Sequence, residues 1–463
     1  MQVKMMCTRH WFLLIFICIV SGLSARTDYC FRVYLKDKGH SGYTLDEPEA
    51  YLSAAAIDRR TREGIFVDET DLPIADSYLE ALAEVGGCPV VKSKWFSTVV
   101  VISEDSLVVD RLKGLPMVDS VKWVWRGEKQ LPEDAPTGDT ALSPRNDPLA
   151  EPYGYAQKQI EMLNGIKLHE AGYRGKGIEV AVIDAGFKNV DRITAFESIR
   201  IAGTRNVVSP HENVFRSSDH GTKVLSCLAA NLPGMMIGTA PEASYWLIKS
   251  EDERSEYPIE EDYWTAAVEF ADSVGVKVIT SSLGYFFFDA GELNYDQSQL
   301  DGKTSLISRA AAKAADKGIL VFSSAGNEGA GNWEKITIPA DAPNVVTVGA
   351  VTNEHSKSSF SSVGFTADAR VKPDVVALGS GCTIIDSSGN IQSANGTSFA
   401  TPILAGLGVC LWQALPWLSN LEVIKLLQEA SSQYRTPDIE LGYGIPDVYK
   451  ALQEERRNDS TSK

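Results

Sequence analysis

The sequence of 463 residues lacks an excess of basic side chains and contains only six histidines. Lys and Arg together number 44 against 61 Asp and Glu, which gives a formal net charge of −17. Because a surface of this sign repels phosphates and anionic lipids, the composition argues against binding to nucleic acids or membrane surfaces. The apolar and charged fractions, 44% and 23%, are ordinary for a soluble globular protein and exclude a collagen-like, coiled-coil or largely disordered chain.

Long hydrophobic runs are also scarce. The one long run, Trp11–Val20, is shorter than the roughly 20 residues that a membrane-spanning helix needs. Lys4 and Arg9 precede or flank this run, and small residues follow it up to Ala25. This order is typical of a signal peptide, with a buried core helix as the alternative. We therefore expect residues 1–25 to be removed and the mature protein to be secreted, to the periplasm or the cell exterior.

Metal-binding cysteine patterns are absent. Two of the seven cysteines fall in the predicted signal peptide, and the others are Cys30, Cys88, Cys227, Cys382 and Cys410. None has the CxxC spacing of a thiolate zinc site, and the HExxH segment of metalloproteases does not occur. An exported protein can form disulfides, but the three cysteines of the second half leave at least one thiol without a partner there. Their pairing stays open.

Two units with different patterns follow the signal peptide. In residues 26–127, strand-like segments such as Phe31–Leu35 and Ser120–Trp125 alternate with segments that are apolar at helical spacing. This pattern predicts a small α+β unit. Residues 128–152 are rich in proline, acidic and small residues and have no hydrophobic period. We therefore expect them to form an exposed linker, the kind of segment that proteases cut.

Residues 153–455 alternate buried strands with helices. Ile178–Ile183 and Ile319–Ser323 are almost continuously apolar, and helix-like stretches such as Ser305–Lys317 lie between such runs. Strands that are covered on both faces have this composition. The pattern predicts an α/β domain with a doubly wound, mainly parallel sheet. The charged residues 456–463 are expected to form a frayed tail.

Three short segments of this domain carry groups that are suited to serine catalysis. Asp184 ends an apolar strand, where functional groups of open α/β sheets lie. His220 follows in DHGTKV, and Ser398 begins a helix of small residues in NGTSFATP. Taken singly, each is more simply a turn residue, a helix cap or a surface residue. Taken together, they supply a nucleophile, a base that accepts its proton and a carboxylate that orients the base.

A fourth segment, SSAGNEG, adds Asn327 in a glycine-flanked loop. A side-chain amide there can stabilise a tetrahedral oxyanion, although a turn residue is the alternative. With IDAGF, DHGTKV, SSLGY, PADAPNVVTVGAV and NGTSFATP, the sequence resembles the subtilisin-like serine proteases (subtilases) from about Gly175 to Ala451. The order Asp, His, Ser along the chain is also that of subtilisins.

The resemblance implies two sets of site residues. The catalytic set consists of Asp184, His220, Ser398 and Asn327. The substrate-binding set consists of Ser282, Leu283, Gly284, Ala325 and Gly326. The first set would hydrolyse peptide bonds through an acyl-enzyme without any cofactor, and the second would pair with the substrate backbone and line the first specificity pocket. We expect an apolar residue just before the cleaved bond, and Trp264 either near the fourth pocket or in the core.

In order and size, residues 26–127 resemble subtilase propeptides, which assist folding and plug the active cleft. On this interpretation residues 128–152 contain the maturation site. The protein would then be a secreted, monomeric proenzyme that acts on polypeptides, with its own prodomain as intramolecular inhibitor. A permanent accessory domain is the alternative for the first unit. A catalytically inactive subtilase-fold binding protein is the alternative for the whole chain.

Some residues depart from the family pattern. Ala185 follows Asp184 where the family has Thr or Ser. Cys227 lies near His220, either as a thiol that reagents reach or as inert packing. The loop Asn231–Ile237 replaces the Asn-rich loop in which many relatives bind calcium. Structural calcium therefore stays open, and no metal-binding residue is predicted.

A nucleotide-binding α/β protein is the other class that the sequence allows us to test. Residues 302–304, Gly-Lys-Thr, match the end of a phosphate-binding loop, but Gln297 stands where the first glycine is required. The glycines of residues 172–177 have the wrong spacing and precede the strand that they should follow. Both motifs fail, and the peptidase remains the predicted function.

Overall fold

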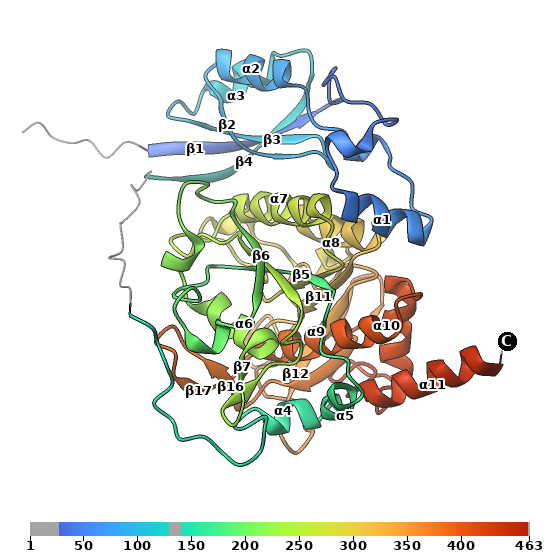
Figure 1. Ribbon diagram of the computed structural model, residues 1–463. Helices are drawn as coiled ribbons and strands as arrows, with labels where there is room; N and C mark the ends of the chain where they lie inside the picture. The colour runs from blue at the N-terminus through green and yellow to red at the C-terminus, as the bar shows by residue number, and fades with distance from the viewer. Residues whose placement is uncertain (1–26, 129–139, 462–463) are drawn as a thin grey trace, which may run out of the picture.

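The computed structural model describes residues 27–128 and 140–461, which form two units in contact (Figure 1). The predicted signal peptide, residues 1–25, lies outside the described residues, as does part of the predicted linker. The N-terminal unit lies on helices of the larger C-terminal unit, so that residues far apart in the sequence meet at the interface.

The N-terminal unit is a four-stranded antiparallel sheet in the order β2-β3-β1-β4. Its strands are β1 (Thr27–Leu35), β2 (Cys88–Ser93), β3 (Thr98–Ser103) and β4 (Val118–Glu128). Its helices are α1 (Ala54–Glu63), α2 (Asp76–Glu84) and α3 (Val108–Lys113). Because side chains alternate along a strand, Val33 and Val101 pack under α2 and α3, whereas Cys30 and Val100 face the C-terminal unit. This is the predicted small α+β unit.

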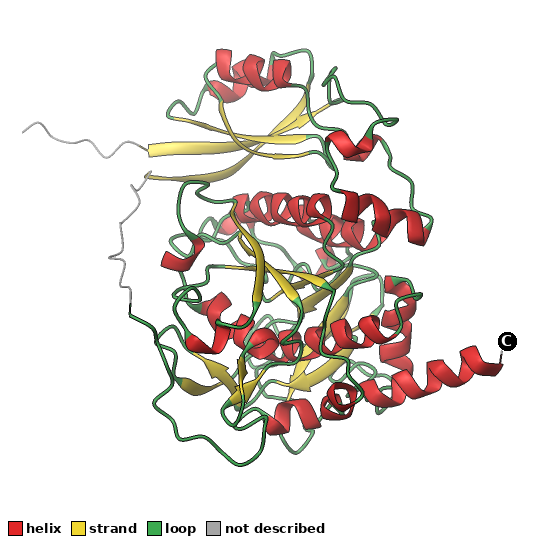
Figure 2. Ribbon diagram, in the orientation of Figure 1, coloured by secondary structure: helices red, strands yellow, loops and turns green. Residues whose placement is uncertain are grey.

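The C-terminal unit contains a seven-stranded parallel sheet (Figure 2). Its order is β15-β12-β11-β10-β5-β9-β6. The strands are β5 (Glu179–Asp184), β6 (Arg200–Asn206), β9 (Ser244–Lys249), β10 (Val278–Ser281), β11 (Leu320–Ser324), β12 (Val346–Val351) and β15 (Val375–Leu378). Consecutive residues of β5 from Val180 to Ile183 are fully buried, because helices cover both faces of the sheet. The predicted doubly wound α/β fold is confirmed.

Helices of the C-terminal unit divide between the two faces of this sheet. On the face toward the N-terminal unit lie α7 (Ile259–Val274) and α8 (Leu306–Asp316). On the other face lie α6 (His220–Ala229), α9 (Thr397–Ala414) and α10 (Asn420–Glu429). Further helices are α4 (Gln157–Glu161), α5 (Gly165–Glu170) and α11 (Val448–Thr461). Short hairpins are β7 (Asn231–Leu232) with β8 (Met236–Ile237), β13 (Gly364–Phe365) with β14 (Val371–Lys372), and β16 (Cys382–Ile385) with β17 (Ile391–Ala394).

Two helices bear on membrane association and on the predicted tail. Among the described residues, α9 is the one helix that is long and apolar enough to cross a bilayer, and 94% of it is buried inside the protein. Helix α11 continues to Thr461, where the sequence predicted a frayed tail from residue 456. Within this helix the guanidinium of Arg456 donates a hydrogen bond to the hydroxyl of Tyr173 and lies over its ring.

The order of the strands places Asp184 where binding sites form in such sheets. From β5 the chain passes to β6, returns to β9 between them, and then continues to β10 on the other side of β5. Strand β5 is therefore the point at which the winding reverses. Open α/β sheets bind ligands outside the carboxyl ends of strands at such a point, and Asp184 is the last residue of β5.

Buried ion pairs join the two units. The guanidinium of Arg32 on β1 binds both carboxylate oxygens of Asp262 on α7, at 2.7 and 2.6 Å. Arg59 on α1 binds Asp272 at the other end of α7. Between them Glu269 accepts hydrogen bonds from the backbone of the turn that follows β2. These contacts fix the N-terminal unit on one face of α7.

Candidate active site

Local packing brings His220 against Asp184. His220 begins α6, and its Nδ1 lies 2.7 Å from Oδ1 of Asp184. The next residue is Gly221, and a Cβ there would lie 2.4 Å from the carbonyl oxygen of Gly186. Glycine is therefore required for α6 to begin this close to the end of β5. The carboxylate of Asp184 is fully buried, whereas 32% of the His220 side chain is exposed, so only the imidazole reaches the solvent.

The electrostatics of the pair favour the protonated imidazole. Burial lowers the pKa of His220, but the charge of Asp184 and its hydrogen bond raise it by more, so the net pKa is raised. Oδ1 of Asp184 also accepts the backbone N–H of Ala185 at 2.8 Å. Its Oδ2 has no hydrogen-bond partner among the described residues. The carboxylate therefore orients the ring through one oxygen and stabilises a positive imidazolium.

Ser398 lies in the first turn of α9. Gly396 precedes the helix with a φ of +155°, a backbone conformation that residues other than glycine rarely adopt. Pro402 lacks the N–H that would bind the carbonyl of Ser398 within the helix, and the hydroxyl of Ser282 donates to this carbonyl instead, at 2.9 Å. The Ser398 hydroxyl donates to the carbonyl of Ser282 at 3.4 Å. It thus lies at the positive end of the helix dipole.

Asn327 follows β11 and faces the same helix end. Its Oδ1 accepts hydrogen bonds from the backbone N–H and the hydroxyl of Thr397, both at 3.0 Å. These bonds fix the side chain beside Ser398 and leave the NH₂ group as a donor toward the cleft. A donor at this place can stabilise negative charge on a carbonyl oxygen that Ser398 attacks.

A cleft of about 450 Å³ connects most of the predicted site residues. It is lined by His220, Ser398, Asn327, Ser282, Leu283, Gly284 and Gly326. Asp184 lies behind His220, and Ala325 is fully buried, so neither lines the cleft. The backbone of Ala325 is held by Thr337, whose N–H donates to its carbonyl at 3.0 Å. A larger cavity, about 580 Å³, lies between the two units and contains none of these residues.

Two further sequence interpretations are settled by burial. Trp264 is fully buried, and its indole N–H donates to the hydroxyl of Ser281 at 2.9 Å, so it belongs to the core and not to a specificity pocket. Cys227 is also fully buried, and burial raises the pKa of its thiol to about 12. The thiol therefore stays protonated and inert. All five cysteines of the described residues are free.

The cleft is also lined by acidic side chains that the sequence motifs did not indicate. These are Glu251, Glu253, Glu256 and Glu328. Glutamates in surface loops are common, so sequence alone gave no reason to select them. Their common location follows from the fold, because β9 and β11 both end at the carboxyl edge of the sheet.

The family's calcium loop does not fit a calcium ion here. The segment from Asn231 to Ile237 forms the β7–β8 hairpin and contains no carboxylate. The amide nitrogen of Asn231 donates to the hydroxyl of Ser198 at 3.0 Å. Calcium requires six to eight oxygen ligands, usually with carboxylates among them. This loop therefore gives no support to a calcium site.

The fold and the cleft define the class of the protein. A carboxylate–imidazole pair and a serine meet at the carboxyl edge of a parallel α/β sheet, as a hydrolase of the serine type requires. The sequence model of the subtilase family matches residues 175–444, and that of the Peptidase S8 propeptide domain, Bacteroidota, matches residues 30–138. The chain therefore belongs to the subtilase family, and it is a serine endopeptidase made with a propeptide.

Similar proteins agree with this assignment. Subtilisin NAT of Bacillus subtilis subsp. natto is 30% identical over 305 residues, which cover 65% of this chain and 71% of that protein. The subtilisin of Bacillus pumilus is 30% identical over 65% of this chain and 98% of its own length. The MycP3 protease from the type VII (ESX-3) secretion system has a similar fold, with a TM-score of 0.52, 23% identity and coverage of 68% of this chain and 91% of that chain. The predicted resemblance to subtilases is confirmed.

Proposed function

We propose that this endopeptidase acts through Ser398, His220 and Asp184. Oγ of Ser398 bonds to the carbonyl carbon of the scissile peptide while Nε2 of His220 takes the hydroxyl proton. The NH₂ group of Asn327 and the backbone N–H of Ser398 donate to the resulting oxyanion. His220 then gives its proton to the leaving amine, the C–N bond breaks, and a water that His220 deprotonates hydrolyses the acyl ester.

One observation supports this mechanism most strongly. The 2.7 Å contact between Nδ1 of His220 and Asp184 leaves Nε2 as the free nitrogen of the ring, in the cleft that Ser398 also lines. In the described structure the serine hydroxyl donates to Ser282 and not to His220. We propose that it turns to His220 when substrate enters, since catalytic hydrogen bonds often form only in the complex. No cofactor takes part in these steps.

We propose that substrate pairs with the segment Ser282, Leu283 and Gly284, which lines the cleft, by strand addition. Gly284 is exposed, and its backbone has no hydrogen-bond partner among the described residues. Free backbone groups of this kind bind an extended peptide. The backbone of Ala325 and Gly326 would form the wall of the first pocket, with an apolar residue preferred there.

We also propose the order of maturation. Residues 1–25 direct secretion, residues 26–127 inhibit the enzyme within the same chain, and residues 153–455 form the peptidase, which acts as a monomer. Leu142 and Leu149 already bind the peptidase unit, through backbone bonds of 2.9 and 2.7 Å to the carbonyls of Arg192 and Gly234. We therefore place the maturation cut between residues 128 and 141.

Ser398→Ala tests the proposal. We expect a loss of peptide hydrolysis of about 10⁶-fold and an uncut precursor. A fluorophosphonate probe followed by mass spectrometry should label Ser398 in the wild type and should report the mature N-terminus in the same experiment. Full activity of Ser398→Ala would exclude the mechanism. A wild type that neither hydrolyses peptides nor reacts with the probe would indicate an inactive binding protein.

A further inference from the structure

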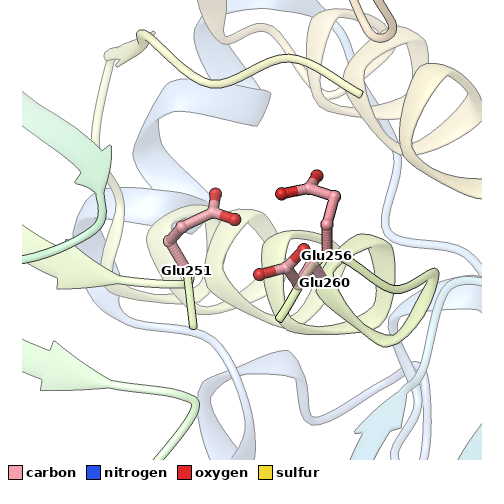
Figure 3. Close-up of side chains that lie close together, drawn as sticks. All are labelled: Glu251, Glu256 and Glu260. Carbon is pink, nitrogen blue, oxygen red and sulfur yellow. The ribbon is translucent and has the colours of Figure 1, made fainter. Parts of the chain in front are cut away.

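Three glutamates, Glu251, Glu256 and Glu260, lie close together (Figure 3). Glu251 follows β9, Glu256 lies in the loop before α7, and Glu260 lies in the first turn of α7. Carboxylate oxygens of all three lie within 4.8 Å of one another. Glu251 and Glu256 line the same cleft as His220 and Ser398. The glutamate cluster is therefore part of the surface that a bound peptide would meet.

The cluster has no cation among the described residues. None of its members forms an ion pair there, and the neighbouring Arg254 is held by Asp252 at 2.6 and 2.8 Å. Glu260 is 1% exposed; its Oε1 accepts the backbone N–H of Asp252 at 3.1 Å, and its carboxyl shares a hydrogen bond with that of Glu251. Glu251 is 8% exposed and accepts one hydrogen bond from the hydroxyl of Tyr285, at 2.7 Å. The buried acids are thus held by hydrogen bonds and by no cation of the described residues.

Several other buried carboxylates of the described residues are paired with cations, whereas Glu269 and Asp341 are held by hydrogen bonds from serine hydroxyls and backbone N–H groups. Asp262, two residues beyond Glu260, binds Arg32, and Asp71 binds the ammonium of Lys317 at 2.8 Å. Buried charges that lack a partner are costly in proteins. A cation that enters the cleft would supply what the chain itself supplies at Asp262 and Asp71.

The energetic state of the cluster agrees with this conclusion. Burial raises the pKa of Glu256 to about 8, and the pKa values of Glu251 and Glu260 are raised by burial as well. Three adjacent carboxylates resist ionisation unless positive charge is nearby. An incoming ammonium or guanidinium group would favour their ionised forms, which gives a cationic ligand a gain that a neutral ligand lacks.

The strand order gives the cluster its place along a bound peptide. Strand β10 leads into the segment 282–284, and it lies between β11 on one side and β5 with β9 on the other. Gly326, after β11, is therefore on one side of the segment, and Glu251, after β9, is on the opposite side. Side chains of an extended peptide point alternately to opposite sides. If the first residue before the cut points toward Gly326, the second and fourth point toward Glu251.

We propose that the glutamate cluster is a substrate subsite for a lysine or arginine side chain at the second or fourth position before the cleaved bond. The proposal rests on the proposed function, since it needs substrate to lie along residues 282–284. Apart from His220, the charged side chains that line the cleft in the described structure are all glutamates. The cleft therefore favours a basic peptide over an acidic or neutral one.

The experiment compares matched peptides on the mature wild-type enzyme. One fluorogenic sequence carries lysine, arginine or norleucine at the second position, and a parallel set varies the fourth, with the first position held apolar. We expect kcat/KM to be about 10- to 100-fold higher for lysine or arginine than for norleucine at one of the two positions. Equal rates for all three residues at both positions would overturn the proposal.

Variants locate the preference. Glu251→Gln combined with Glu256→Gln should reduce it to about twofold or less, while the fraction of enzyme that a fluorophosphonate labels shows that the fold is intact. Glu170→Gln on α5 removes the same type of charge outside the cleft and should keep the preference. A preference that survives in the double variant would contradict the assignment to the cluster.

Two further outcomes separate this subsite from other interpretations. If calcium raises the melting temperature of the wild type but not of the double variant, and no basic preference exists, then the cluster binds a metal and the peptide proposal is wrong. If no peptide is cleaved and no serine is labelled, both the proposed function and the subsite proposal fail. Cleavage and labelling without basic preference overturn the subsite alone.

Discussion

Among single side chains, Asp184 decides how basic the proposed catalytic imidazole is. Burial alone lowers the pKa of His220, whereas the charge of Asp184 and its hydrogen bond raise it above the usual value. A general base must be neutral to accept a proton, so activity is lost as the pH falls through this raised pKa. Removal of the negative charge leaves burial as the main influence and therefore shifts the pKa of His220 downward.

Asp184→Asn should accordingly change both rate and pH profile. We expect kcat to fall about 10⁴-fold, because the imidazolium loses its stabilising carboxylate. The acidic limb of the remaining kcat/KM profile should move to lower pH, which stopped-flow or long-duration assays across the acidic and neutral range would show. Asp368→Asn, which changes an exposed partner of Arg370, should leave the profile where it is. An acidic limb that stays at the wild-type pH would contradict the assigned role of Asp184.

The residues that could be predicted were those whose type is dictated by chemistry. Ser398 and Asn327 lie in short motifs whose neighbours are glycine and small residues, because the backbone must approach closely there. The acids Glu251 and Glu260 could not be predicted, since a glutamate in a loop or a first helical turn is ordinary for a surface. Their significance depends on burial and on the absence of a cationic partner in the described structure, and both follow only from the tertiary structure.

Helix α7 carries several of the carboxylates that hold the propeptide unit. Its residue Asp272 binds Arg59 and Arg60 of α1, the latter at 2.6 Å, and all three side chains are almost fully buried. Arg60 has a second partner in Asp71, whereas Asp272 is the only carboxylate that binds Arg59 in the described structure. Removal of Asp272 would leave a buried guanidinium without its counter-ion.

Asp272→Ala should therefore loosen the precursor. The measurement uses the uncut precursor that carries Ser398→Ala. In this precursor we expect the free energy needed to undock or unfold the propeptide unit to fall by about 3 kcal/mol, because one partner of a buried ion pair has been removed. Urea denaturation followed by tryptophan fluorescence would measure it. In the mature enzyme, which lacks α1, the same change should cost much less.

An exposed ion pair on α1, the helix that carries Arg59 and Arg60, provides the control. Asp58 and Arg62 pair at 2.9 Å, and both are more than half exposed. Asp58→Ala should change the same free energy by about 0.5 kcal/mol or less. If Asp58→Ala and Asp272→Ala destabilise the precursor equally, the buried pairs do not hold the propeptide unit.

At the level of elements, several central strands and the edge strand β4 were predictable, whereas the edge strands β2 and β6 were not. Strands β5 and β11 have partners on both sides and helices on both faces, so their sequences are continuous apolar runs. Strands β2 and β6 lie at sheet edges and contain proline or charged residues, which hid them from a search for apolar patterns. The ion pairs between units were also unpredictable, because Arg59 and Asp272 are 213 residues apart.

For the molecule as a whole, the acidic balance of the chain and the acidic cleft act in the same direction. The formal net charge is −17, and the charged side chains that line the cleft, His220 apart, are glutamates. A cleft with one sign of charge concentrates substrates of the opposite sign and speeds their capture. This long-range attraction is screened by salt, since the Debye length falls from about 30 Å at 0.01 M to about 3 Å at 1 M ionic strength.

Salt should therefore slow the cleavage of basic peptides selectively. Between about 0.01 M and 0.5 M NaCl we expect kcat/KM for the lysine peptide to fall about 3- to 10-fold, whereas the norleucine peptide should change by less than about twofold. The double variant Glu251→Gln, Glu256→Gln should show a shallower dependence for the lysine peptide, because the two carboxylates that ionise as the ammonium approaches are gone. Initial rates at several salt concentrations, with KM and kcat determined separately, would show whether the loss lies in capture. An equal salt dependence for both peptides would mean that the charge of the cleft does not guide substrate.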